Sequence, residues 1–145
     1  MLSIRLDKSR IKDLLDLSSA DGFPYQLTEK TARIYCAGKA FDEEGVQTYG
    51  VWIDDRLVSV MTATFCRVFP CEDSPHGRIV HLSGAFTLPS FRSRRCATEL
   101  LYLIEKDAAA FGADYLCCDS TADELYRSFG FGPAPENETR MWKKL

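Results

Sequence analysis

The chain has 145 residues and a mass of 16.4 kDa, which is the size of one domain and too short for two full domains. Hydrophobic residues make up 46% and charged residues 27%, an ordinary globular composition that argues against a disordered, fibrous or coiled-coil protein. The formal net charge of −3 argues against chain-wide binding to nucleic acid or to an anionic membrane.

The N-terminal residues and the cysteines indicate the cellular compartment of the protein. Residues 1–8 lack the apolar core of a signal peptide, and no run approaches the roughly 18 apolar residues of a transmembrane helix. The six cysteines contain no C-x-x-C pair, and the chain has two histidines, so a zinc site is not expected. We therefore expect reduced, mostly buried cysteines in a cytoplasmic protein.

The N-terminal third predicts one strand and two helices. Partial alternation of apolar and polar residues predicts a short edge strand over residues 2–6. Asp7 is the expected N-cap of the first helix, and Thr28 is the expected N-cap of the second. The apolar face of the second helix predicts that it continues through Gly38 to Phe41.

The centre of the chain is rich in predicted strands. Residues 49–53 and 57–68 read as two strands, and the sequence Asp54-Asp55-Arg56 between them is typical of a hairpin turn. Residues 69–77 contain two prolines and a glycine and are expected to form a loop. Residues 78–87 predict a third strand, which stops before a proline.

The clearest helix covers residues 97–111, where apolar residues recur with a period near 3.6, and Gly112 is well placed to end it. A buried strand over residues 115–118, a helix over 122–129 and a strand over 140–144 follow. The order β-α-α-β-β-β-α-β-α-β predicts a mixed α/β (α+β) domain. Its strand–helix–strand unit predicts one parallel pair of strands.

The loop before that helix carries the charge pattern that suggests a ligand. Residues 89–98 place three arginines and several hydroxyl groups at a helix N-terminus. Unpaired amides and the positive end of the helix dipole make such a position favourable for phosphate, and arginines add charge-assisted hydrogen bonds. The alternative is a solvated basic turn in which Ser93 or Thr98 caps the helix.

Two segments resemble the GNAT-type N-acetyltransferase superfamily. Residues 84–101, GAFTLPSFRSRRCATELL, are similar to its acetyl-CoA-binding segment, and residues 125–131, LYRSFGF, resemble its L-Y-x-x-x-G-F motif. Residues 139–145 are similar to its closing strand. The resemblance implies one acetyltransferase domain over residues 1–145, with a central, mostly antiparallel sheet and a splayed parallel pair. It also implies transfer of acetyl from acetyl-CoA to a primary amine, without a metal.

The resemblance further implies which residues contact CoA. The strand over residues 81–87 would pair its free backbone groups with the pantetheine amides, at positions Ala85, Phe86 and Thr87. The positions implied to lie against the pyrophosphate are Arg92, Ser93, Arg94, Arg95, Cys96, Ala97 and Thr98.

Arg95 departs from the family pattern, because the first motif glycine falls at this position. A glycine there lets backbone amides approach the phosphates closely. The arginine could bind the 3′-phosphate or a pyrophosphate oxygen, or it could crowd the loop and weaken CoA binding. We expect binding to be retained, because Arg92 and Ala97 fit their motif positions.

The resemblance also suggests groups for proton transfer. Tyr126 stands at the family's motif tyrosine and is the candidate general acid for the CoA thiolate, the alternative being a buried packing role. His81 stands where many members have a glutamate and is a candidate base, or a strand histidine without chemistry. Asp119 and Ser120 follow the next strand and could orient substrate or water. A dedicated base is not required, since a free amine near its pKa needs little help.

The acceptor is not identified by the sequence. A small-molecule or peptide amine is expected, and Phe23, Tyr25, Phe69 and Asp73 are candidates for lining its pocket. The resemblance makes a homodimer plausible. A domain that binds acyl-CoA or a metabolite without turnover is the main alternative. Nucleic-acid binding through the arginine cluster is disfavoured, because no aromatic residues interleave with it and the chain is acidic.

Overall fold

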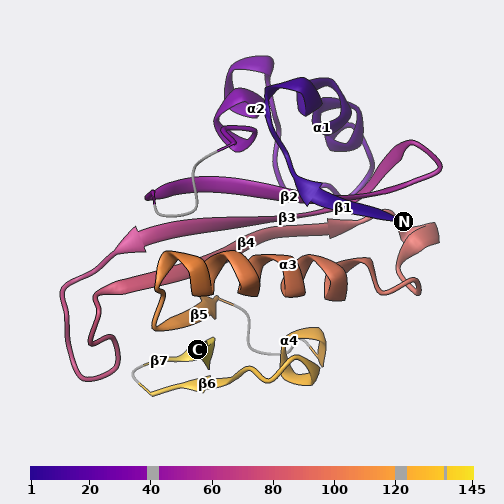
Figure 1. The fold of residues 1–145 in the computed structure, drawn as a ribbon. Helices are drawn as coiled ribbons and strands as arrows, with labels where there is room; N and C mark the ends of the chain where they lie inside the picture. Colours follow the sequence, from indigo (N-terminus) through magenta and orange to yellow (C-terminus); the bar gives the residue numbers. More distant parts are fainter. Residues whose placement is uncertain (39–42, 120–123, 136) are drawn as a thin grey trace.

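The computed structural model describes residues 1–38, 43–119, 124–135 and 137–145, and within them a seven-stranded sheet carries helices on both faces (Figure 1). The strand order is β1-β2-β3-β4-β5-β7-β6. The strands are β1 (Leu2–Arg5), β2 (Gly45–Ile53), β3 (Arg56–Arg67), β4 (Arg78–Thr87), β5 (Tyr115–Cys118), β6 (Gly132–Ala134) and β7 (Asn137–Lys144). The α-helices are α1 (Ile11–Ser18), α2 (Glu29–Tyr35), α3 (Cys96–Phe111) and α4 (Glu124–Ser128), and 3-10 turns occupy Lys8–Arg10 and Pro89–Phe91.

One pair of strands in this sheet is parallel. Ile79–Leu82 of β4 lie beside Tyr115–Cys118 of β5, and every other pairing is antiparallel. Helix α3 connects the two parallel strands, as a crossover between parallel strands requires. The predicted fold class, a mostly antiparallel sheet with one parallel pair, is therefore confirmed.

The β2–β3 hairpin shows how short-range sequence sets the register. Asp54 (φ 51°) and Asp55 (φ 61°) both adopt the left-handed conformation, which a two-residue type I′ turn requires. Aspartate tolerates this conformation better than most residues with a Cβ atom. The hairpin predicted from this segment is confirmed, with longer strands than expected.

Helices cover the sheet from two sides (Figure 1). On one face Phe111 of α3 packs edge-on against Phe65 of β3, with ring centroids 5.4 Å apart. On the other face α1 and α2 pack on β3 and β2, above the hydrogen-bonded hydroxyls of Thr48 and Thr62. Gly112 (φ 82°) ends α3 in the left-handed conformation, as predicted.

One expectation about the elements is wrong, and one strand was missed. Helix α2 begins at the predicted cap Thr28 but ends at Tyr35, and Gly38 (φ 61°) lies beyond it in a left-handed conformation that breaks a helix. Phe41 lies outside the described residues. Strand β6 was not predicted, because its three residues, Gly-Pro-Ala, have neither alternation nor β-branched side chains. Of the predicted helix over 122–129, residues 122 and 123 also lie outside the described part.

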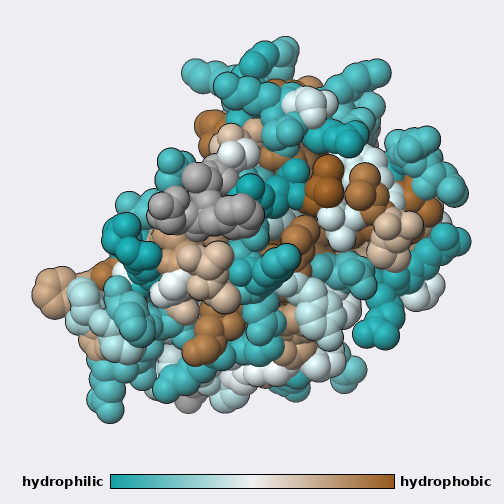
Figure 2. All heavy atoms as spheres, viewed as in Figure 1, coloured by the Kyte–Doolittle hydropathy of each residue, from teal (hydrophilic) through white to brown (hydrophobic). Residues whose placement is uncertain are grey.

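The outer surface is largely polar where the helices face solvent. Figure 2 shows hydrophilic side chains over the exposed sides of α1 and α2. Across the described ranges, no helix combines the length and the apolar character needed to cross a bilayer.

Candidate functional site

Strands β4 and β5 separate halfway along β4. Their pairing runs from Ile79 to Leu82, and β4 then continues to Thr87 paired with β3. At the point of separation the register with β3 shifts, and Gly84 adopts φ 60°. A Cβ atom at Gly84 would come within 2.7 Å of the Tyr25 ring, so glycine is required here for both conformation and space. Within the described part of the chain, the β5-side edge of the last part of β4 is therefore not used by the sheet.

An open cavity of about 640 Å³ borders this edge. It lies where the end of β4, the loop that leads into α3, the α1–α2 connection and α4 meet. Its lining residues are Gly22, Val60, Ala85, Phe86, Thr87, Arg92, Ser93, Arg95, Cys96, Ala97, Thr98 and Leu125. We call it the β4–α3 cavity.

The N-terminus of α3 forms one wall of the cavity. The first hydrogen bond closing this turn runs from the Glu99 amide to the Arg95 carbonyl at 3.2 Å, so the amides of Cys96, Ala97 and Thr98 precede it. Arg95, the N-cap residue, makes no side-chain cap. A sixteen-residue helix thus presents amide donors and the positive end of its dipole to the cavity.

Arg95 itself adopts φ 60° and ψ 25°, the left-handed region in which the family's glycine would be unstrained. The backbone therefore keeps the conformation that the motif glycine favours, with an arginine in its place. The side chain is exposed and lines the cavity, so it adds a positive charge to it.

The two other arginines of this loop, Arg92 and Arg94, make different contacts. Arg92 lines the cavity and donates from Nε to the carbonyl oxygen of Thr87 at 3.0 Å, which ties the loop to the end of β4. The guanidinium of Arg94 lies over the Phe91 ring, 5.2 Å from its centroid. Nine of the ten residues expected to bind CoA line the β4–α3 cavity, and Arg94 is the tenth.

A cluster of three polar side chains lies where β4 and β5 separate. Nε2 of His81 lies 3.0 Å from Oδ2 of Asp119, and Nε of Arg140 donates to Oδ1 of the same carboxylate at 3.0 Å. The hydrogen bond from Arg140, followed by that from His81, holds the pKa of Asp119 below its usual range. The same contact raises the pKa of Arg140. Arg140 had no signal in the sequence, because it lies on a strand 21 residues further on. Ser120 lies outside the described residues.

Tyr126 lies on α4 next to Leu125, which lines the β4–α3 cavity. The Tyr126 side chain is buried, with 5% of the residue exposed, and its ring packs edge-on against Phe131 at 5.4 Å. Tyr126 itself is not one of the residues that line the cavity, so its role as the general acid stays a prediction.

The residues considered for an acceptor pocket separate into three groups. Phe23 packs on Phe86 at 5.2 Å, and Tyr25 and Phe23 enclose a space of about 10 Å³, too small for a substrate. Phe69 is 92% exposed at the β3–β4 loop. Asp73 lines an open groove of about 300 Å³, which we call the β5–β7 groove. The lining residues of this groove are Cys71, Asp73, Tyr115, Ala134, Pro135, Arg140 and Trp142.

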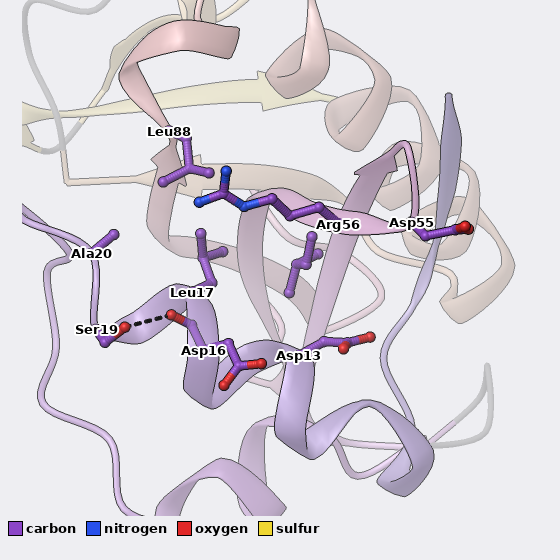
Figure 3. A pocket seen from close by; sticks show the side chains of 9 residues that line it. Asp13, Asp16, Leu17, Ser19, Ala20, Asp55, Arg56 and Leu88 are labelled. Atoms are coloured by element: carbon purple, nitrogen blue, oxygen red, sulfur yellow. Dashed lines mark hydrogen bonds between the residues drawn. The ribbon is translucent and has the colours of Figure 1, made fainter.

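A further cavity of about 250 Å³ lies between α1 and the β2–β3 turn (Figure 3). Asp13, Asp16 and Asp55 contribute three carboxylates, and the guanidinium of Arg56 extends toward Leu88. Carboxylates repel phosphate groups, so this cavity does not suit a polyanionic ligand such as CoA.

One of the six cysteines, Cys96, lines the β4–α3 cavity, and burial raises the pKa of its thiol. All six are free, and Cys96, which lines the cavity, is buried. Burial raises the pKa of Cys117 to about 12 and that of Cys36 to about 11, so both thiols are protonated at neutral pH.

A sheet with one splayed parallel pair and a helix N-terminus at the split is the arrangement that the sequence resemblance implies for an acyl-CoA-dependent acetyltransferase. The profile of the Acetyltransferase (GNAT) family matches residues 11–131, and the chain belongs to this family. A comparison with curated proteins gave no significant match.

Solved structures with the same fold are numerous. A predicted acetyltransferase from Clostridium acetobutylicum, solved with acetyl-CoA, has a TM-score of 0.73 at 16% identity over 94% of this chain and 92% of that one. The aminoglycoside 6′-N-acetyltransferase AAC(6′)-IG of Acinetobacter haemolyticus has a TM-score of 0.69 at 18% identity over 94% of each chain. A probable N-acyltransferase from Enterococcus faecalis has a TM-score of 0.67 at 18% identity; the match covers 90% of this chain but spans 32% of that protein. Identities this low establish a shared fold.

Proposed function

We propose that the protein is a single-domain N-acetyltransferase that transfers acetyl from acetyl-CoA to a primary amine. The observation that carries this proposal is the meeting of two features in one cavity. The unpaired edge of β4 beyond Leu82 and the N-terminus of α3 both face the β4–α3 cavity. Family membership and the fold shared with an acetyl-CoA complex support it.

The residues that line the cavity suit two parts of acetyl-CoA, the pantetheine arm and the pyrophosphate. Backbone groups of Ala85–Thr87 would pair with the amides of the pantetheine arm, in the direction that a neighbouring strand would take. The amides of Cys96–Thr98 would bind the pyrophosphate. Arg95, exposed at the same cavity, would add a charge-assisted bond to a phosphate.

The reaction needs two proton movements. The neutral amine of the acceptor attacks the thioester carbonyl carbon, so that a C–N bond forms and the C–S bond breaks. Tyr126 donates a proton to the departing sulfur and recovers it from solvent. His81, oriented by Asp119 at 3.0 Å, accepts the proton that the amine nitrogen loses, directly or through water.

A titration and a turnover assay test the proposal together. Calorimetric titration with CoA should show one saturable site, and acetyl-CoA with a panel of amines should release free thiol. Replacing Thr98 by Pro would remove an amide donor at the α3 N-terminus and should weaken CoA binding, whereas Ser9→Pro at the distant 3-10 turn should not. No binding at millimolar CoA would overturn the proposal.

A second candidate function follows from Arg95, which stands at the motif glycine. A domain that binds acyl-CoA without transferring the acyl group would show the CoA titration but no thiol release with any amine. The cytoplasmic setting with reduced cysteines stays a prediction from the sequence.

A further inference from the structure

The β5–β7 groove lies on the same face of the sheet as His81. Cys117 of β5 pairs with His81 on one side and with Trp142 on the other, so these three side chains share a face. Side chains two positions apart on a strand point to the same face. Tyr115 precedes Cys117 by two positions and Arg140 precedes Trp142 by two, so both lie on the face of His81 as well. The groove therefore runs along β5 and β7 up to the His81–Asp119–Arg140 cluster.

The floor of the groove is aromatic. The rings of Tyr115 and Trp142 are 5.0 Å apart and meet edge to face at 66°. The exposed ammonium of Lys144 already lies 5.5 Å from the Trp142 ring centroid. Ring faces of this kind attract cations, and a ligand ammonium can take the place of a solvated lysine there.

The end of the groove remote from His81 is negative. Asp73 is half-buried in the β3–β4 loop and lines the groove next to Tyr115. Burial is the main cause that raises the pKa of the Tyr115 phenol, and the negative charge of Asp73 adds to it. A carboxylate beside an aromatic floor favours a cation and repels an anion.

At the other end of the groove, among the described residues, the positive charge of Arg140 is paired with a carboxylate. Arg140 is the guanidinium at this end, and its Nε is bonded to Asp119. Asp119 lies four positions after Tyr115, which corresponds to roughly 13 Å at about 3.3 Å per residue. An extended ligand can therefore place one end at Asp119 and His81 and the other at Asp73.

We propose that the β5–β7 groove binds the acceptor as an extended diamine. One amine of the ligand lies neutral at the His81–Asp119 end, where it is acetylated. The second is an ammonium held by Asp73 over the rings of Tyr115 and Trp142, and an apolar chain joins the two. This inference rests on the proposed acetyl transfer for the fate of the first amine, but not for the binding of the second.

Kinetics with matched amines test the class of acceptor. Linear α,ω-diamines from diaminopropane to diaminodecane should show the lowest KM at a middle length, and monoamines of equal length should show a KM at least ten-fold higher. Asp73→Asn should raise the KM of the best diamine about ten- to hundred-fold, with kcat little changed and the monoamines unaffected. Glu72→Gln, an exposed carboxylate beside Asp73, is the control and should leave both unchanged.

A binding measurement without acetyl-CoA separates the groove from the chemistry. Cys71 lines the groove and is the exposed one of the six free cysteines, so alkylation followed by mass spectrometry reports on its occupancy. The best diamine should slow alkylation of Cys71 several-fold in the natural protein and in Glu72→Gln, but not in Asp73→Asn. Equal alkylation with and without diamine, or equal KM for diamines and monoamines, would overturn the inference while acetyl transfer stood. Protection of Cys71 without thiol release would support the groove and overturn acetyl transfer.

Discussion

Nε2 of His81 lies 3.0 Å from Oδ2 of Asp119, across the point where β4 and β5 separate. The other oxygen of that carboxylate accepts from Nε of Arg140 at 3.0 Å. A histidine held by a carboxylate has a fixed ring orientation, which a proton acceptor needs. In the proposed mechanism, Arg140 would act through Asp119 and would therefore be a positioning residue for His81.

Arg140→Gln should move the titration of Asp119 to higher pH. The hydrogen bond from Arg140 is the largest cause of the lowered pKa of Asp119, so its removal lets that pKa rise toward the usual value. The Asp119 carboxylate and its contact with His81 are lost as pH falls through the pKa, and this loss should begin at higher pH in the variant. NMR titration of the Asp119 carboxyl carbon measures the shift, and the acid limb of kcat/KM should follow it. Arg33→Gln on α2 is the control, and an unchanged Asp119 titration in Arg140→Gln would contradict the assignment.

Arg95→Gly should raise the stability of the fold and weaken CoA binding. A non-glycine residue in the left-handed region is strained, so glycine should stabilise the fold by about 1 kcal/mol in thermal or denaturant unfolding. Loss of the guanidinium should weaken CoA binding about ten-fold in calorimetry.

Arg33→Ala on α2 is the control for this prediction, because its guanidinium is paired with Glu29 at 2.8 Å and does not line the β4–α3 cavity. It should change CoA affinity little. Tighter CoA binding by Arg95→Gly would show instead that the arginine crowds the loop.

Tyr126→Phe should lower kcat about 10²- to 10⁴-fold if the phenol protonates the leaving thiolate. The ring and its contact with Phe131 at 5.4 Å are kept, so CoA affinity should remain. Thermal unfolding of the variant checks that the buried site is intact. Tyr102→Phe on the exposed side of α3 is the control. Turnover by Tyr126→Phe within about two-fold of the natural protein would remove Tyr126 from the proposed mechanism.

Local signals explain the parts of the fold that the sequence predicted well. The bounds of β4 and β5 were predicted to the residue, because a proline follows β4 and polar residues flank the apolar run of β5. Helix α3 and its end at Gly112 follow from the apolar period and the left-handed cap. Residues 89–98 were recognised as a helix entry with clustered arginines, and nine of the ten expected CoA residues share one cavity.

Long-range relationships were not predictable, because nothing in the local pattern encodes them. The hydroxyl of Tyr49 donates to the buried carboxylate of Asp107 at 2.6 Å, although 58 residues separate them. Gly84 has no local signal that distinguishes it from another strand glycine. It is required because the Tyr25 ring, 59 positions earlier in the chain, leaves no room for a Cβ atom. The β5–β7 groove likewise collects residues from positions 71–142, so no local motif could show it.

Asp114→Asn should lower the free energy of unfolding at neutral pH. It should also remove the part of the pH dependence of stability that comes from the titration of Asp114. The Asp114 carboxylate fixes the β3–β4 loop, because it accepts from Oγ of Ser74 at 2.7 Å and from the amide of His76 at 3.1 Å, and it lies 2.6 Å from Nδ1 of His76. Burial acts to raise the pKa of Asp114, but the hydrogen bonds from Ser74 and His76 outweigh it and hold the pKa below its usual range.

The sign of this pH dependence follows from the lowered pKa. The stabilisation is complete above the ordinary aspartate pKa of about 4 and is lost as pH falls through the lower pKa of the folded state. Urea unfolding should therefore show a deficit of about 1–3 kcal/mol for Asp114→Asn at pH 7, which shrinks toward pH 2. Glu72→Gln in the same loop should show no such deficit. Because the loop carries Asp73 to the β5–β7 groove, Asp114→Asn should also raise the KM for diamines. A deficit that persists undiminished at pH 2 would mean that the asparagine disturbs packing rather than these hydrogen bonds.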